Sequence, residues 1–177
     1  IVFDPDVARS LLGTFAGCIL GGAIWRKSSY LVEREGSLVA SPLVFVDDDP
    51  LILRGPGSRP YDGEGLASRK NVVVEAGVLK TFLLDCYSAR KLGKKSTANA
   101  AVSGGSIGAS TTNFVLRKGS LTRDEIIRST QRGLYVTEMM GFGFNAITGD
   151  FSRGAAGFWI EDGKFGQPVS EVTVSSN

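Results

Sequence analysis

Apolar side chains recur every third or fourth position over residues 4–20, which is the period of an amphipathic helix. Asp4 can cap the first free amide groups of such a helix, and Pro5 suits its first position because that position needs no amide hydrogen. The pair Gly21 and Gly22 follows the last apolar position. We therefore expect a helix over about residues 4–20, ended by this glycine pair.

Farther along the chain, short β-prone runs replace the helical period. Two such runs, at 71–75 and 78–84, are joined by only two residues, of which the second is Gly77. The run at 158–161 is followed by a similar two-residue turn that ends in Gly163. Two-residue turns that contain glycine favour antiparallel hairpins. We therefore expect two β-hairpins.

Three further segments have the patterns of strands. Residues 30–46 form short β-like runs, residues 134–140 form an apolar run, and residues 168–174 alternate between apolar and polar side chains. With the two hairpins, these segments predict that β-sheet dominates the fold.

A capping box predicts a second main helix. Thr122 can accept a hydrogen bond from the amide of Glu125, whose carboxylate can reach back to the amide of Thr122. Gly133 is a suitable residue to follow the last turn. We expect this helix over about residues 122–132, and a short helix over residues 87–92.

Together these segments predict an α+β fold, with mostly antiparallel sheet and two main helices at about residues 4–20 and 122–132. The length of 177 residues and the hydrophobic fraction of 42% suit one domain with its own core. The side chains expected in that core include Phe15, Phe82, Leu83, Phe158, Trp159 and Ile160.

Charge and cysteine usage narrow the classes of function. Lys and Arg total 20 against 18 Asp and Glu, and the resulting net charge of +2 argues against nucleic acid as a partner. No apolar run is long enough to cross a membrane. Cys18 and Cys86 lie far apart and outside any metal-binding motif, so we expect reduced thiols and a cytoplasmic location.

The sequence contains no histidine, which removes Ser–His and Cys–His pairs and imidazole metal sites. No Ser-x-x-Lys motif lies at a helix start to indicate a catalytic Ser–Lys dyad. A catalytic pair of carboxylates stays an open alternative, because the sequence does not show which acidic side chains face each other. The run Asp47, Asp48 and Asp49 suggests a cation site, but the spacing of an EF-hand is missing. We expect a solvated turn before Pro50 instead.

Several long motifs resemble one known family. Residues 145–160 (Asn-Ala-Ile-Thr-Gly-Asp-Phe-Ser-Arg-Gly-Ala-Ala-Gly-Phe-Trp-Ile), residues 87–93 with the following Ser-Thr-Ala-Asn-Ala at 96–100, and the turn-rich loop at 55–65 occur in the family's order. They are similar to the C-terminal half of the TldD/PmbA proteins, and within them to the PmbA/TldE type. Since that family carries a further N-terminal domain, we expect residues 1–177 to be a single C-terminal domain and the chain to be a fragment.

The resemblance also implies where a zinc site would lie. In TldD-type subunits the first helix carries an HExxxH zinc motif, followed by a glycine-rich turn and an Arg-Lys pair. Aligning on Gly22 and on the pair at 26–27 places Gly13, Thr14 and Cys18 at the positions of the first His, the Glu and the second His. Glycine and threonine neither hold zinc nor take a proton from its water, and one thiolate does not make a site. We therefore expect no catalytic or metal-binding residue in this chain, and zinc only in a TldD-type partner.

By the same resemblance, the chain is expected to be the partner without zinc in a cytoplasmic metallopeptidase system that acts in proteolysis or peptide maturation. It would form a heterodimer with a TldD-like subunit, or self-associate, and the substrate would be a peptide or unfolded polypeptide. The glycine density and polar residues of 141–152 lead us to expect a sheet edge there that holds an extended peptide. The residues expected to contact peptide or partner are Arg59, Asp62, Glu64, Glu138, Asn145, Thr148, Asp150, Ser152 and Arg153.

Several alternatives stay open at the level of sequence. The loop at 55–65 fits a purely structural role equally well. Glu138, a carboxylate within an apolar run, also fits an edge position or a pair with Arg132 or Arg153. The whole chain could instead be a non-enzymatic regulatory binding module of the DNA gyrase modulator type, or a self-associating structural domain.

Overall fold

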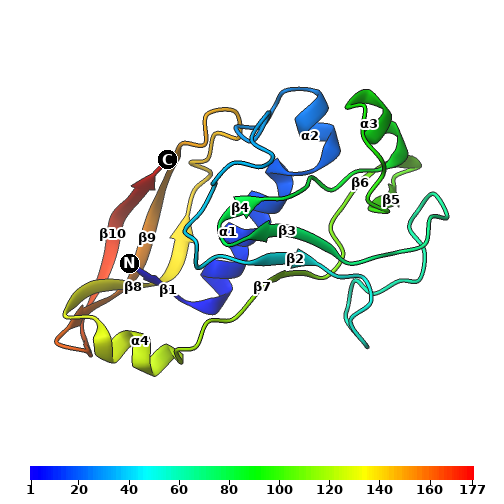
Figure 1. Ribbon diagram of the computed structural model, residues 1–177. Coiled ribbons are helices and arrows are strands. Elements are labelled where there is room, and N and C mark those ends of the chain that lie inside the picture. Colours follow the sequence, from blue (N-terminus) through cyan, green and yellow to red (C-terminus); the bar gives the residue numbers. More distant parts are fainter. The chain divides into compact units, whose positions relative to one another are not determined.

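The computed structural model describes residues 1–177, and the contacts between them divide the chain into two compact units (Figure 1). Unit 1 consists of Ile1–Thr14 and Gly119–Asn177, and unit 2 consists of Phe15–Lys118. The helix α1 (Pro5–Cys18) begins in unit 1 and ends in unit 2. No feature of the sequence indicates this subdivision, and the sequence leads us to expect one domain.

Unit 1 is built on a four-stranded sheet in the order β1-β8-β9-β10. β1 (Val2–Phe3) runs parallel to β8 (Arg132–Met140), and β9 (Phe151–Glu161) pairs antiparallel with both β8 and β10 (Lys164–Ser176). The three long strands run side by side in Figure 1. The expected α+β fold with mostly antiparallel sheet is confirmed.

The hairpin of β9 and β10 turns at the two residues that the sequence indicates. Asp162 has a φ of 47° and Gly163 a φ of 74°, so both have left-handed backbones. This pair of conformations belongs to the tight turn whose twist matches that of the flanking strands. The predicted hairpin is therefore confirmed.

The core of unit 1 lies between α1 and the sheet, where Val7 packs with Leu134, Val136, Ala155 and Val174. A second small cluster joins buried side chains of α4 (Arg123–Ser129), β8 and β9. Both faces of the sheet thus bury some apolar side chains.

Three consecutive residues of β9 are expected in the core, but only Ile160 is buried. Phe158 is 40% exposed and Trp159 is 36% exposed. Successive side chains of a strand point to opposite faces, so Trp159 lies on the other face of the sheet from Phe158 and Ile160. Phe158 lies against Phe165, with ring centroids 5.8 Å apart, near the surface. The predicted burial of Phe158 and Trp159 is therefore wrong.

The capping box of α4 is present as predicted. Thr122 Oγ1 accepts a hydrogen bond from the amide of Glu125 at 3.3 Å, and Glu125 Oε2 accepts one from the amide of Thr122 at 2.7 Å. The helix ends before residue 132, because Thr130 already has an extended backbone. Gly133 lies in β8 and pairs with β9, so the expectation that it follows the helix is wrong.

The main sheet of unit 2 has the order β4-β3-β2-β7, and all its neighbours are antiparallel. The strands are β2 (Val46–Asp48), β3 (Asn71–Glu75), β4 (Val78–Leu79) and β7 (Phe114–Leu116). The two turn residues between β3 and β4 have φ values of 47° and 78°. The turn of this hairpin is therefore as predicted, but its second strand is shorter than the expected 78–84, because β4 ends at Leu79.

Other parts of unit 2 differ from the sequence expectation. Residues 30–46 are expected to form strands, but up to residue 45 they form turns, bends and one isolated bridge at Leu38. Glu33 (φ 63°) and Gly36 (φ 83°) have left-handed backbones, which interrupt an extended strand. β5 (Ala100–Ser103) and β6 (Ser106–Ala109) form a separate two-stranded hairpin that was not expected.

Two short helices, α2 (Gly21–Trp25) and α3 (Cys86–Lys91), lie close together in unit 2. Their approach depends on Gly21, because a Cβ there would lie 2.1 Å from Ser88 Oγ. α1 already ends at Cys18, so the glycine pair begins α2 instead of ending α1. α3 confirms the short helix expected after residue 86. None of the helices, of which α1 with 14 residues is the longest, is long and apolar enough to span a membrane.

The core of unit 2 includes Phe82 and Leu83, which are 3% and 0% exposed, as expected. Phe15 is only half-buried, and its ring stacks on Phe114 with centroids 6.4 Å apart. Other apolar side chains of unit 2 that are at most 1% exposed include Ile19, Leu31, Val73, Val74, Leu79 and Leu84.

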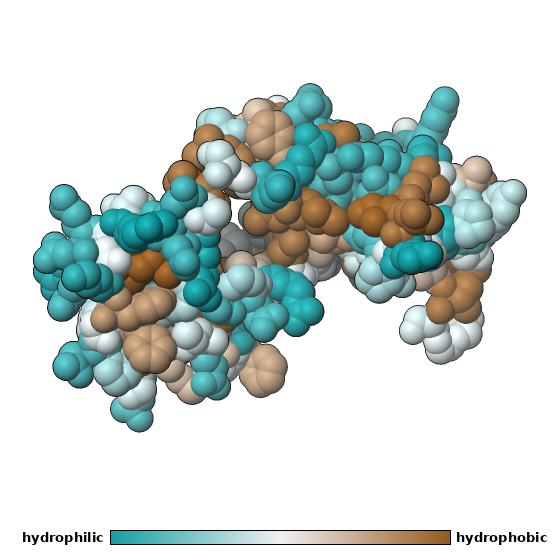
Figure 2. All heavy atoms as spheres, turned by 90° about the horizontal axis from the view of Figure 1, so that it is seen from below, coloured by the Kyte–Doolittle hydropathy of each residue, from teal (hydrophilic) through white to brown (hydrophobic).

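Apolar side chains also reach the surface, and Figure 2 shows them as brown patches among teal polar residues. The most exposed of them are Leu43 and Leu53 of unit 2, at 88% and 89%, and Phe142 of unit 1, which is fully exposed.

Two of the three consecutive aspartates are buried in β2, so the expectation of a solvated turn is wrong. Asp48 is 0% exposed and accepts hydrogen bonds from Asn99 Nδ2 and from the amide of Thr112, each at 2.6 Å. Asp47 is 5% exposed and accepts two hydrogen bonds from Arg117, at 2.6 and 2.8 Å. These carboxylates hold β2 to neighbouring segments, because their partners replace water.

The ion pairs of Asp47 predict a pH-dependent stability. The hydrogen bonds from Arg117, aided by the charge of Lys70, hold the pKa of Asp47 below its ordinary value. A carboxyl group with a lowered pKa stabilises the fold above its unfolded pKa, and this contribution is lost as the pH falls through its folded pKa. We expect Asp47→Asn to be less stable than the native chain at neutral pH, and the difference to close as the pH falls below about 4.

Urea unfolding at several pH values measures this difference in stability. Asp162→Asn is a suitable control, because Asp162 is exposed and asparagine also accepts its left-handed backbone. A difference between native chain and Asp47→Asn that stays constant down to about pH 2 would contradict the role of the ion pairs.

Candidate functional site

The three residues at the positions of a zinc motif lie on α1. Gly13 has open space where a side chain would stand, and Thr14 Oγ1 donates a hydrogen bond to the main-chain oxygen of Ser10 at 3.1 Å. Cys18 is 3% exposed, and burial raises the pKa of its thiol. No three His, Cys, Asp or Glu side chains gather to hold a metal ion. The residues at these positions therefore do not fit a zinc site.

Two of the candidate residues in the turn-rich loop bind the chain itself. The buried Asp62 accepts hydrogen bonds from the amides of Glu64, Leu66 and Ala100 at 2.9–3.1 Å. Glu64 Oε2 accepts a hydrogen bond at 2.8 Å from the amide of Cys86, the first residue of α3. Both carboxylates thus hold the loop against neighbouring segments, which favours the structural alternative for these two residues.

Arg59 differs from its neighbours in the same loop. Its main-chain amide donates to the oxygen of Pro50 at 3.0 Å, but Nε and Nη2 of its guanidinium are buried without a hydrogen-bond partner. A guanidinium normally satisfies this pair of donors with a carboxylate or another oxygen. Arg59 stays a candidate contact residue on these grounds.

The segment at 141–152 is a loop rather than the expected sheet edge. Only its last two residues belong to β9, and a single bridge joins Phe144 to Phe151. Asn145 Oδ1 accepts hydrogen bonds from the amides of residues 147 and 148 at 3.0 and 3.4 Å. These contacts close the loop on itself, because it must reverse the chain between β8 and β9.

Asp150 closes the same loop from its other side. It accepts hydrogen bonds from Thr148 Oγ1 at 2.6 Å and from Asn177 Nδ2 at 2.8 Å. The hydrogen bond from Thr148 is the main cause that lowers the pKa of Asp150. Asp150, Asn145 and Thr148 therefore hold the loop in its closed conformation.

The remaining candidates lie on the strands of unit 1. Ser152 Oγ lies 3.0 Å from Ser175 Oγ on β10. Arg153 makes one long hydrogen bond of 3.5 Å to the main-chain oxygen of Met139, and its Nε is buried without a partner. Glu138 is exposed on β8 and forms no ion pair with either arginine that the sequence suggests. Of the alternatives for Glu138, the structure favours the edge position, because β1 pairs with β8 only at Tyr135 and Val136 and does not reach Glu138.

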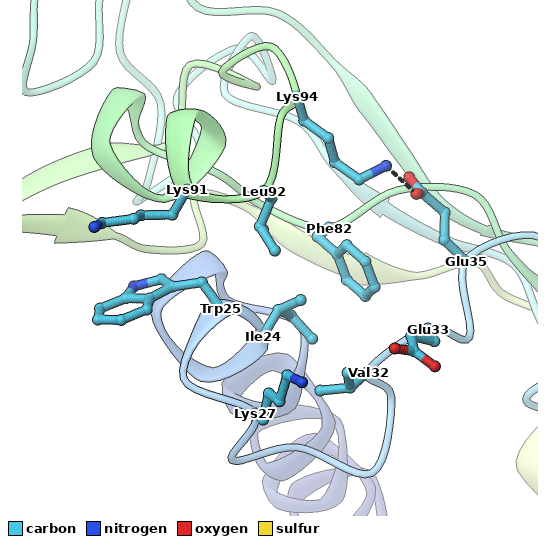
Figure 3. A pocket seen from close by; sticks show the side chains of 10 residues that line it. All are labelled: Ile24, Trp25, Lys27, Val32, Glu33, Glu35, Phe82, Lys91, Leu92 and Lys94. Carbon is cyan, nitrogen blue, oxygen red and sulfur yellow. Dashed lines mark hydrogen bonds and ion pairs between the residues drawn. The ribbon is translucent and has the colours of Figure 1, made fainter.

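Unit 2 also contains a pocket that no sequence pattern predicts (Figure 3). Its volume is about 590 Å³, and its lining comes from α2, the loop after it, Phe82 and the end of α3. The residues with charged side chains in this lining include Lys27, Glu33 and Lys94. Because four short segments meet here only in the fold, no motif or period marks their residues. Two left-handed backbones, at Lys27 and Glu33, are its most unusual local feature.

Comparison with known proteins identifies the family. The family model described as the PmbA/TldA metallopeptidase C-terminal domain matches residues 1–177. The chain therefore belongs to the PmbA/TldA metallopeptidase C-terminal domain family, and the resemblance found in its motifs is confirmed.

The relatives of the chain carry the names PmbA, TldE and gyrase modulator. Metalloprotease PmbA of Escherichia coli O157:H7 is 40% identical over 177 residues, which are 100% of this chain and 38% of that protein. The crystal structure of a candidate modulator of DNA gyrase from Bacteroides thetaiotaomicron has a TM-score of 0.89 and 32% identity, and covers 99% of this chain and 38% of its own. TldE from Thermococcus kodakarensis has a TM-score of 0.82 and 28% identity, and covers 94% of this chain and 39% of its own. The chain thus spans less than half the length of these relatives.

Proposed function

We propose that this chain is the subunit without a zinc site in a TldD/TldE-type metallopeptidase system, where it supports assembly and peptide binding while a TldD-type subunit supplies zinc. The observation that carries the proposal is the set of side chains on α1. Gly13 has no side chain, and the hydroxyl of Thr14 cannot act as a carboxylate base. The raised pKa of the buried Cys18 thiol disfavours the thiolate form that binds zinc.

Assembly with another chain is supported by the surface. Leu43, Leu53 and Phe142 are almost fully exposed, and contact with another chain would remove these apolar side chains from water, which is favourable. The free thiols of Cys18 and Cys86 suit a reducing compartment, and we place the assembly in the cytoplasm.

An extended peptide can bind beside the part of β8 that β1 does not cover. β1 pairs with β8 only at Tyr135 and Val136, so residues 137–140 have no strand on that side. The other edge of the sheet, β10, is less suitable because Pro168 and the left-handed Glu171 (φ 56°) interrupt its pairing. A peptide that adds as a strand beside residues 137–140 would have the exposed Glu138 within reach.

Reconstitution with a TldD-type subunit tests this function. Adding this chain is expected to raise zinc-dependent cleavage of a denatured protein about tenfold or more, which corresponds to about 1.4 kcal/mol of transition-state stabilisation. This chain alone is expected to show no cleavage. Glu138→Ala should reduce the stimulation, whereas Glu161→Ala, which removes an exposed carboxylate on the same sheet, should not.

Two outcomes would overturn the proposal. One is stoichiometric zinc bound to this chain together with cleavage by this chain alone, measured by metal analysis and the same peptide assay. The other is no stimulation of the TldD-type subunit at any ratio of the two chains. Direct association with gyrase in that case would favour the regulatory alternative.

A further inference from the structure

The pocket of unit 2 has an apolar floor. Ile24 and Phe82 line it although each is only 3% exposed, and Val32 and Leu92 complete its apolar surface (Figure 3). Its volume of about 590 Å³ falls within the range of pockets that bury most of a small ligand. A bulky apolar group can therefore pack against this floor.

One wall of the pocket is a fixed aromatic ring. The ring centroid of Trp25 lies 5.8 Å from that of Tyr87 in an edge-to-face arrangement. Lys91 Nζ lies 5.9 Å from the Trp25 centroid and 5.5 Å from the Tyr87 centroid. Contacts of this geometry are attractive, so Trp25 is held in place and the charge of Lys91 is engaged by the two rings.

The rim of the pocket offers one free cation and one free carboxylate. Lys94 forms an ion pair with Glu35, so the charges of these two side chains neutralise each other. Lys27 and Glu33 line the same pocket and form no ion pair. Their φ values of 56° and 63° are rare for residues with side chains, and Figure 3 shows both at one edge of the pocket beside Val32.

We infer that this pocket takes a bulky apolar side chain of a peptide, and that Lys27 and Glu33 hold the main-chain amides next to it. A peptide main chain carries both a donor and an acceptor at each residue. The carboxylate of Glu33 accepts from an N–H, and the ammonium group of Lys27 donates to a C=O. A fatty acid brings only acceptors and a polyamine only donors, so neither uses both charges.

The inference rests on the proposed function for the choice of peptides as the ligand class, and it adds a preference for apolar residues. The predicted site is separate in sequence from the open edge of β8, because all its residues belong to unit 2. Peptide sequences rich in leucine or phenylalanine are therefore expected to bind this chain better than polar ones.

The intrinsic fluorescence of Trp25 reports on binding. The chain has 2 tryptophans, so the variant Trp159→Phe leaves Trp25 as the only one. This variant is titrated with acetyl-Ala-Ala-Leu-Ala-Ala-amide and with the same peptide carrying serine in place of leucine. The leucine peptide should change the emission in a saturable way, and the serine peptide should bind about tenfold or more weakly because it buries no apolar side chain.

Substitutions at the rim test the two charged residues. Lys27→Asn and Glu33→Asn remove one charge each and keep a residue that tolerates a left-handed backbone. Each should weaken binding of the leucine peptide about threefold to tenfold. Arg54→Asn is the matched control, since Arg54 is charged, exposed and left-handed (φ 59°) but does not line the pocket, and it should bind like the parent variant.

Equal affinities for the two peptides, or no saturable change in Trp25 emission, would overturn the inference. A saturable response to laurate in the absence of one to peptide would overturn the peptide assignment and identify the pocket as a lipid site. The titration uses this chain without a TldD-type subunit, so its failure leaves the proposed function intact. Leucine-selective binding without stimulation of cleavage would instead overturn the proposed function alone.

Discussion

Replacing Gly157 by alanine is expected to destabilise the chain by about 3 kcal/mol or more. A Cβ at this position of β9 would lie 1.9 Å from the main-chain oxygen of Tyr135 and 2.9 Å from its carbonyl carbon. Tyr135 belongs to β8, which pairs with β1 on one side and β9 on the other, so its backbone cannot move away without losing hydrogen bonds of the sheet. Urea unfolding followed by circular dichroism measures the loss.

Gly154→Ala is the matched control in the same strand. A Cβ there would meet Cβ of Met140 at 3.6 Å, which is an ordinary contact distance. This variant is expected to stay within about 1 kcal/mol of the native chain, because no backbone needs to move. Similar losses for Gly154→Ala and Gly157→Ala would show that the steric argument does not hold.

Replacing Asp48 by alanine should cost a comparable amount, about 3 kcal/mol. The substitution removes the acceptor for two donors at once, the amide nitrogen of the Asn99 side chain and the main-chain amide of Thr112. Asn99 is 0% exposed, so water cannot replace the lost carboxylate without a rearrangement. The free energy of unfolding again measures the effect.

Asp49→Ala separates this effect from the loss of any aspartate in the run. Asp49 is half-buried, and its Oδ1 accepts one local hydrogen bond, from the amide of Leu51 at 2.9 Å. We expect this variant to lose about 1 kcal/mol. If Asp48→Ala lost no more than Asp49→Ala, the buried network around Asp48 would not be a main source of stability.

Local features of the fold could be predicted from sequence because neighbouring residues decide them. The turns that end in Gly77 and Gly163 both have left-handed backbones, as their two-residue spacing indicates. The capping box of Thr122 and Glu125 forms as expected, because both of its hydrogen bonds stay within one helical turn. The sequence does not indicate the end of α4, because Gly133 pairs with Ile160 of β9, which lies far away in sequence.

The buried aspartates show why other features could not be predicted. Asp47 and Asp48 read as a solvated turn in the sequence, because acidic runs usually face water. Their partners lie 70, 51 and 64 residues away, at Arg117, Asn99 and Thr112. These groups come together only when the chain folds, and no spacing between residues in the sequence predicts their hydrogen bonds.

The prediction of site residues from the sequence has the same limit. The motifs were sufficient to identify the family, yet Asp62 and Asp150 bind main-chain and side-chain groups of this chain itself. No sequence pattern indicates the pocket beside Trp25, because its lining comes from short segments without a shared motif. Contact with peptide stays a prediction for the residues proposed from sequence.

Unit 1 is discontinuous, and this affects how the chain can be dissected. Phe15–Lys118 is one uninterrupted piece, whereas unit 1 joins Ile1–Thr14 to Gly119–Asn177. A recombinant fragment that starts at Gly119 would lack both β1 and the core residue Val7. Expression of the C-terminal sheet as a separate protein therefore requires the N-terminal segment to be spliced onto it, for example through a short glycine-rich linker or by circular permutation.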